Sequence, residues 1–168
     1  MRVALAIVVP LVAALLQGSV VPFVSIAGAR PNLPLLVAGS WSVAAGAREG
    51  VWWAFVGGLA TDLLSGGPTG ALALASLMPV AAIGLGEAQL ARPRSVVGGA
   101  VLVGVASLAA GLLYLGVLAA MGQALADAPL LAGTTAAGAI YNGVLAIATY
   151  PIARIVRRAT EKQASFGW

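Results

Sequence analysis

Long apolar runs alternate along the chain with short breaks of glycine, proline and charged residues. Runs such as LAIVVPLVAALL and VLVGVASLAAGLLYLGVLAAM are continuously apolar, without the alternation at every second position that a barrel strand shows. Inside hydrocarbon every backbone N–H and C=O group needs an internal partner, and a helix supplies these partners within one segment. The pattern therefore predicts an all-α protein built from apolar helices.

The breaks divide the chain into six candidate membrane spans. A span needs about 20 residues at a rise of about 1.5 Å per residue. The second and third segments are short, and we expect them to borrow residues from the turn around Arg48 and Glu49. The predicted spans are 3–21, 32–47, 50–64, 69–90, 95–121 and 133–156, within a single membrane domain of residues 1–168 that ends in a basic tail at 157–168.

Composition places this bundle in lipid. Hydrophobic residues make up 61% of the chain and charged residues only 8%, and the mean hydropathy is +1.02. Too few polar side chains are present to cover a surface that faces water. We therefore expect a polytopic membrane bundle of six transmembrane helices.

The basic residues predict its orientation. If the N-terminus is cytoplasmic, eight of the nine basic residues lie on the cytoplasmic side and only Arg30 is external, as the positive-inside rule requires. An odd number of spans would separate Arg2 from the C-terminal cluster, so both termini are expected in the cytoplasm. The cytoplasmic set is Arg2, Arg48, Arg92, Arg94, Arg154, Arg157, Arg158 and Lys162.

One alternative concerns the first segment. Arg2, the apolar run and the small residues Ser25-Ile26-Ala27 also fit a cleaved signal peptide, which would leave five spans and spoil the charge pattern. Aromatic residues agree with six spans: Trp52, Trp53 and Tyr150 are expected at the inner interface. Trp41 lies deep in the second span and is expected to pack against a neighbouring helix.

The stretch GGLATDLLSGGPTG carries a lone carboxylate, Asp62, just before an external break. A carboxylate costs about 2.5–3.5 kcal/mol at the bilayer centre and less near an interface. Gly66 and Gly67 can turn N–H groups toward it, Pro68 prevents simple helix continuation, and Thr69 is expected to cap the next helix. We interpret Asp62 as a carboxylate that organises the turn, with a ligand, proton or partner contact as the alternative.

Asn142, in the last span, poses the same question, because its amide needs partners in lipid. An interhelical hydrogen bond is the simpler interpretation, and a functional contact is the alternative. Small residues at four-residue spacing let helices approach closely, and we interpret these rows as internal packing, with a partner surface as the alternative. The rows are Ala38–Ser42–Gly46, Gly50–Ala54–Gly58 and Thr134–Gly138–Asn142.

Catalytic chemistry is hard to assemble from these residues. The chain has no cysteine and no histidine, which excludes disulfides, thiolate nucleophiles, imidazole catalysis and zinc sites built on either residue. A pair of aspartates would have to use Asp127, which lies in a polar external loop, and the lone Lys162 is in the tail. Phosphate-binding loops of the Gly-x-x-x-x-Gly-Lys type are absent, and the basic residues are too scattered for nucleic-acid binding. We predict a protein that is not an enzyme and that uses no cofactor or metal.

Two segments resemble the family of the rod shape-determining protein MreD. In GGLATDLLSGGPTGALALASL, Gly58, Asp62 and Gly70 match the glycine, aspartate and helix-opening glycine of that family's third-to-fourth span region. In IYNGVLAIATYPIARIVRR, Asn142 and Pro151 stand at the matching positions of its final helix. The opening Pro31-Asn32-Leu33 is also similar, although an aspartate is common in the family where Asn32 stands.

The resemblance implies a multi-pass subunit of the bacterial inner membrane that belongs to the cell-elongation machinery. The implied partner is MreC, a protein with one transmembrane helix, and through it RodA, a penicillin-binding transpeptidase and MreB filaments. The family's bundle is also thought similar to the substrate-binding component of energy-coupling-factor vitamin transporters, so binding of a vitamin-like small molecule is the alternative function.

The basic tail with Arg154, Arg157, Arg158 and Lys162 predicts attraction to anionic membrane lipid. Contact with a cytoplasmic partner is the alternative for this patch.

Overall fold

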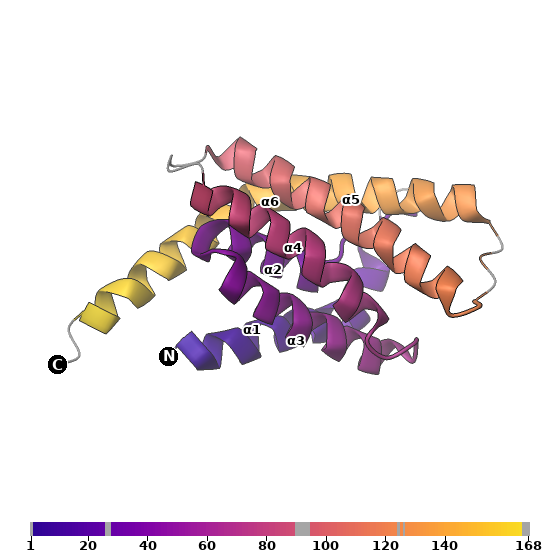
Figure 1. The fold of residues 1–168 in the computed structure, drawn as a ribbon, viewed down its shortest axis with the longest axis horizontal. Coiled ribbons are helices and arrows are strands. Elements are labelled where there is room, and N and C mark those ends of the chain that lie inside the picture. Colours follow the sequence, from indigo (N-terminus) through magenta and orange to yellow (C-terminus); the bar gives the residue numbers. More distant parts are fainter. Residues whose placement is uncertain (1, 26–27, 90–94, 124, 126, 166–168) are drawn as a thin grey trace.

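The computed structural model describes residues 2–25, 28–89, 95–123, 125 and 127–165, which form six α-helices and one short 3-10 helix (Figure 1). The all-α prediction is confirmed for these residues. The elements are α1 (Arg2–Ser19), η1 (Val21–Phe23), α2 (Leu33–Ala45), α3 (Ala47–Ser65), α4 (Ala71–Gln89), α5 (Val96–Ala120) and α6 (Ala128–Ser165).

Two helices differ most from the predicted spans. Helix α3 begins at Ala47 and takes Arg48 and Glu49 into its first turn, so it borrows residues from the turn as expected. Helix α6 begins at Ala128 and has 38 residues, whereas the predicted sixth span is 133–156. The earlier start follows from Pro129, because proline is well suited to the first turn of a helix, where its missing N–H is not needed.

Helix α2 lies at the centre of the bundle and contacts each of the other five α-helices. Although it has only 13 residues, ten of them are buried, which leaves little of its surface to face lipid. The Asn32 side chain caps its N-terminus by accepting a hydrogen bond from the Leu35 N–H at 3.1 Å. The shortest of the six described α-helices is thus the central element.

The outer helices carry an apolar surface. Helices α5 and α6 are long and apolar enough to cross a membrane, and only 22% of the most apolar window of each is buried. An apolar core helix of a water-soluble protein would be mostly buried, so this exposure indicates a membrane protein. Shorter apolar helical stretches are Val3–Ser19, Leu33–Ala45 and Ala71–Leu85. The full set of six spans stays a prediction.

Glycines bring α3 into close contact with both of its main neighbours. A Cβ atom added to Gly50 would lie 2.2 Å from the Cβ of Ser42 on α2, and one added to Gly58 would lie 2.7 Å from the Cα of Ala73 on α4. Ala38, Ser42 and Ala54 are also buried. The second row and the first two members of the first row therefore pack inside the bundle, whereas Gly46 ends α2 and has no atom within 4 Å of an added Cβ.

Two of the predicted interface aromatics are core residues. Trp53 and Tyr150 are 4% and 2% exposed, so they pack inside the bundle, and their depth in the membrane stays a prediction. The Trp53 ring stacks on the Trp41 ring, with ring centroids 4.4 Å apart. Trp41 therefore packs against a neighbouring helix, as the sequence predicted. Successive helix residues point about 100° apart, so Trp52 faces outward, at 52% exposed, while Trp53 faces inward.

The start of α1 and the end of α6 lie at the same end of the bundle, and the Gly66–Gly70 turn, the end of α5 and the start of α6 lie at the other (Figure 1). The last part of α6, drawn in yellow, leaves the bundle at an angle to the preceding part. Pro151 lies inside α6 and cannot donate the backbone hydrogen bond of its position, which is a common cause of bends in helices.

Candidate functional site

Asp62 caps helix α4 from the last turns of α3. Its carboxylate is 3% exposed, and its Oδ2 atom accepts hydrogen bonds from the N–H groups of Gly70 (2.9 Å), Leu72 (3.1 Å) and Ala73 (3.4 Å). The first N–H groups of a helix have no partner within the helix, and a negative charge there interacts favourably with the helix dipole. The carboxylate is thus satisfied by the protein itself.

The turn between α3 and α4 brings these N–H groups to the carboxylate. Gly66 and Gly70 have positive φ values, 68° and 92°, in the left-handed region that favours glycine. Gly67 and Pro68 lie between them and lead the chain into α4. The cap expected from Thr69 is supplied by Asp62 instead, because the N–H groups of Leu72 and Ala73 point toward the end of α3.

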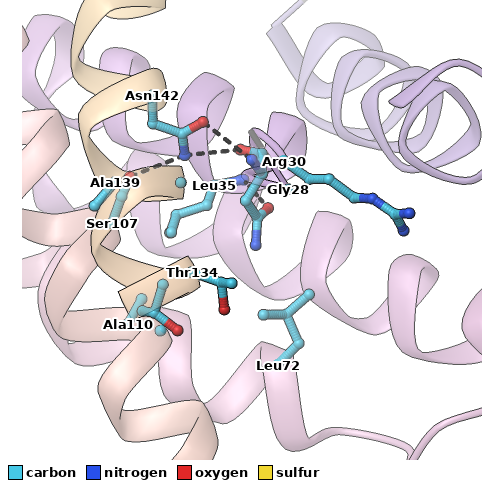
Figure 2. Close-up of a pocket in the computed structure, with 13 residues that line it drawn as sticks. Gly28, Arg30, Leu35, Leu72, Ser107, Ala110, Thr134, Ala139 and Asn142 are labelled. Carbon is cyan, nitrogen blue, oxygen red and sulfur yellow. Dashed lines mark hydrogen bonds between the residues drawn. The ribbon is translucent and has the colours of Figure 1, made fainter. Parts of the chain in front are cut away.

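Asn142 binds the backbone at the entry to α2. Its Oδ1 accepts from the Asn32 N–H at 3.0 Å, and its Nδ2 donates to the Asn32 carbonyl oxygen at 3.1 Å and to the Ser107 hydroxyl at 3.0 Å (Figure 2). Asn142 is 1% exposed. The amide therefore joins α6 to α5 and to the start of α2.

Gln17 of α1 holds the same segment from the other side, and sequence reasoning missed it. Its Oε1 accepts from the Leu33 N–H at 2.8 Å, and its Nε2 donates to the Pro31 carbonyl oxygen at 3.1 Å. Like Asn142, it is an isolated amide in an apolar run, and this signal could have identified it. Both amides bind backbone atoms of residues 31–33, so they do not depend on which side chain stands at position 32.

A cavity of about 280 Å³ opens beside this cluster, between the segment before α2 and helices α4, α5 and α6. Asn142, Ser107 and Thr134 contribute polar groups to its wall, and the Arg30 side chain extends away from them (Figure 2). Gly138 also lines it, and a Cβ atom there would lie 2.9 Å from the Arg30 carbonyl oxygen. The cavity is partly polar and is bounded by the third row of small residues.

A second hollow is an open groove along the outer seam of α5 and α6, with a volume of about 490 Å³. Small residues line it where the helices approach closely, including Gly104 and Gly143. Apolar side chains form its rims, and Val101, Ile140 and Val144 are 58%, 70% and 59% exposed. This groove offers an apolar surface for a helix dissolved in the membrane.

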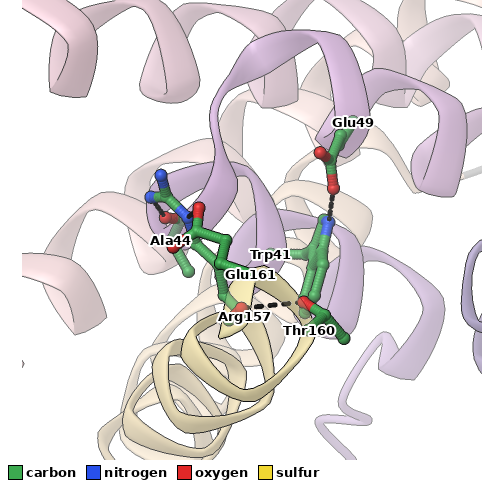
Figure 3. Close-up of polar contacts among 6 residues, drawn as sticks. All are labelled: Trp41, Ala44, Glu49, Arg157, Thr160 and Glu161. Carbon is green, nitrogen blue, oxygen red and sulfur yellow. Dashed lines mark hydrogen bonds and ion pairs between the residues drawn. The ribbon is translucent and has the colours of Figure 1, made fainter. Parts of the chain in front are cut away.

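The described basic residues of the predicted patch differ in their contacts. Arg157 donates to the Ala44 carbonyl oxygen at the end of α2 and forms an ion pair with Glu161 at 2.9 Å (Figure 3). Arg154 lies over the Tyr150 ring, 5.7 Å from its centroid. Arg158 is exposed, and the side chain of Lys162, like Arg92 and Arg94, lies outside the described residues. Arg157 therefore anchors the end of α6 to the bundle.

Glu49 is also engaged at this end of the molecule, where its Oε2 accepts from the Trp41 Nε1–H at 2.9 Å (Figure 3). Over the described part of the chain, no three Asp, Glu, His or Cys side chains lie close enough together to hold a metal ion. Apart from the Arg157–Glu161 pair within α6, these polar contacts join one helix to another or to its entry segment.

Comparison with known proteins identifies one family. The model of the family described as rod shape-determining protein MreD matches residues 1–159. No curated protein and no solved structure matches the chain.

Proposed function

The chain belongs to the MreD family of rod shape-determining proteins, and we propose that it is a non-catalytic inner-membrane scaffold that binds the transmembrane helix of MreC. Through this contact it would help to control peptidoglycan synthesis during cell elongation. The observation that carries the proposal is the groove between α5 and α6, whose wall is almost entirely apolar.

The proposal includes six spans with both termini in the cytoplasm. Its support is that Arg48 lies beside Val3 near the start of α1 and Arg157 binds the end of α2. Arg30, in contrast, lies beside Thr134 in the first part of α6. A bilayer retains basic residues on its cytoplasmic side. The groove then faces the hydrocarbon region, where a single-span partner would meet it.

The shape of the groove fits a helix. Its α5 wall extends from Val97 to Leu108, a length of about 16 Å along the axis. Lipid chains are as apolar as the groove, so association in the membrane depends on close van der Waals packing, and small residues at the floor permit it. Gly104 and Gly143 leave room at the floor, and Val101 and Val144 stand as rims beside them.

Blocking the groove tests the proposal. Val144→Trp, at an exposed position on the groove, is expected to lower the amount of MreC that co-purifies in detergent by about tenfold, since overpacking costs about 1–3 kcal/mol. Met78→Trp, at a position on α4 that is 74% exposed, is the matched control and should leave co-purification unchanged.

Cross-linking provides a second measurement. The chain lacks cysteine, so a single cysteine at Ile140 has no competing native thiol in this chain. It should cross-link to a cysteine in the MreC transmembrane helix, and a cysteine at Met78 should not. Equal cross-linking at both positions, or unchanged co-purification of Val144→Trp, would reject the groove as the MreC site.

RodA, the penicillin-binding transpeptidase and MreB are proposed as further members of the same complex. The part of α6 that leaves the bundle supports a cytoplasmic contact, since Arg158 is exposed there and Arg157 holds the segment in place.

A second function has one specific observation in its favour. The cavity of about 280 Å³ beside Asn142 has the partly polar wall of a small-molecule site, as a substrate-binding component of an energy-coupling-factor transporter would need. Native mass spectrometry of the purified chain should then show a retained small molecule that Thr134→Trp displaces. An empty chain would dismiss this function.

A further inference from the structure

A third hollow lies between α1 and α3, at the end of the bundle where α1 begins. It has a volume of about 450 Å³. Val3, Ala6 and Ile7 of α1 form one wall, and Trp52 of α3 forms the other. Val3 is 74% exposed and Ile7 is 41% exposed, so the walls are open to the surroundings and can accommodate a flexible chain.

Arg48 places a positively charged side chain in this groove. Arg48 lines it, is exposed, and has no hydrogen bond or ion pair with any group in the part of the chain that the structure describes. It lies in the first turn of α3, where a positive charge interacts unfavourably with the helix dipole. The stability of α3 therefore does not explain why an arginine stands at this position.

The neighbouring carboxylate forms no ion pair with Arg48 in the part of the chain that the structure describes. Glu49 also lines the groove, but its Oε2 accepts the hydrogen bond of the Trp41 indole. No side chain caps the first turn of α3, so the N-terminal end of this helix adds partial positive charge near Arg48. The groove thus holds an exposed arginine that is paired with no carboxylate in the described part of the chain, beside apolar walls.

Trp52 adds an exposed aromatic ring to the wall of the groove. It is 52% exposed, and tryptophan is enriched where a membrane meets water, because its ring is apolar and its N–H is polar. The Trp52 ring can cover an acyl chain while its N–H remains near polar headgroups.

We propose that the groove between α1 and α3 binds an anionic phospholipid. The lipid phosphate pairs with Arg48, and one acyl chain runs along Val3, Ile7 and Trp52. A zwitterionic lipid supplies the chain without net charge, and inorganic phosphate supplies the charge without the chain. Both are therefore expected to bind more weakly than an anionic phospholipid.

The test uses the full chain purified in detergent, with retained lipid measured by native mass spectrometry and stability measured by thermal unfolding. Phosphatidylglycerol should be retained and should raise the unfolding temperature, whereas phosphatidylcholine and inorganic phosphate should have little effect. Arg48→Gln should lower phosphatidylglycerol affinity about fivefold, since a basic residue near an anionic membrane contributes about 1 kcal/mol.

Three further variants make the result specific. Arg48→Lys should restore binding, because it keeps the charge, and it shows that loss in Arg48→Gln is not a failure to fold. Trp52→Ala should weaken retention while it keeps the cation. Arg158→Gln removes an exposed basic residue away from the groove and should change nothing.

The proposal is overturned by equal loss in Arg48→Gln and Arg158→Gln, or by equal retention of phosphatidylglycerol and phosphatidylcholine. An inorganic phosphate effect as large as that of phosphatidylglycerol would also overturn it and would identify an anion site. These outcomes are independent of MreC, so they do not bear on the groove between α5 and α6.

Discussion

Asp62 and Asn142 show how much an isolated polar residue in an apolar run reveals. Both are recognisable from the sequence because a polar group in lipid needs a partner. The identity of the partners was not recognisable: Asp62 binds N–H groups up to eleven residues away, and Asn142 binds a segment 110 residues away. Gln17 had the same pattern and a similar role.

The first prediction concerns Asp62. Asp62→Leu should destabilise the protein by about 3 kcal/mol or more, because three N–H groups lose their acceptor and each unsatisfied buried group costs about 1–3 kcal/mol. Asp62→Asn keeps one acceptor oxygen and should lose only about 1 kcal/mol, the usual scale of the charge–dipole interaction. Thermal or denaturant unfolding in detergent measures both.

Asp127→Asn is the control, since Asp127 is exposed. If Asp62→Asn leaves stability and assembly intact but abolishes function in cells, the turn does not account for Asp62. A proton or ligand role would then replace that interpretation.

At position 32, where the family resemblance implies an aspartate, the chain has an asparagine that builds the local structure. The Asn32 side chain caps α2 through the Leu35 N–H, and an aspartate can accept the same hydrogen bond. Asn142 and Gln17 bind backbone atoms at this entry. The departure therefore leaves the arrangement unaffected.

At the scale of elements, glycine has several structural roles that sequence spacing does not distinguish. Gly58 lets α3 and α4 approach, and Gly84 lets α4 approach the start of α3, where an added Cβ atom would lie 2.4 Å from the Ala47 N atom. Gly116 of α5 has no atom within 4 Å of an added Cβ. Only the packing of the helices identifies which glycines are needed.

The second prediction compares these glycines. Gly58→Ala should destabilise the bundle by about 1–3 kcal/mol, because the new Cβ would meet backbone atoms of Ala73 that no rotamer change can move away. It should also weaken the Asp62 cap, which uses the Ala73 N–H. Thermal unfolding in detergent provides the measurement.

Gly116→Ala is the matched control. It should leave stability unchanged or raise it by up to about 1 kcal/mol, because alanine favours a helix more than glycine does. Equal losses in the two variants would mean that the α3–α4 contact is not as close as described here.

For the whole molecule, the apolar exterior and the charge distribution together support a protein embedded in the bilayer. The exposed faces of α5 and α6 are apolar, and a wide polar surface is absent from the composition. The family match and the grooves then direct attention to contacts with other membrane components.

The third prediction concerns topology. Single cysteines in place of Ser25 and Asp127 should react with a membrane-impermeant maleimide in intact spheroplasts, since the proposed topology places both exposed residues outside the membrane. A cysteine in place of Arg158 should react only after permeabilisation. Labelling of Arg158→Cys from outside, with the N-terminus cytoplasmic, would exclude an even number of spans.

The all-helical, lipid-facing character could be predicted from the sequence alone, because it depends on what each residue does in hydrocarbon and not on its neighbours. The sequence alone also predicted which polar residues need partners and where the turn after Asp62 lies. Tertiary structure alone decided that short α2 is the central helix, that Trp53 faces inward to stack on Trp41, and that Arg157 holds the end of α2. These features depend on which helices meet, and residues far apart in the sequence determine those contacts only after the helices have packed.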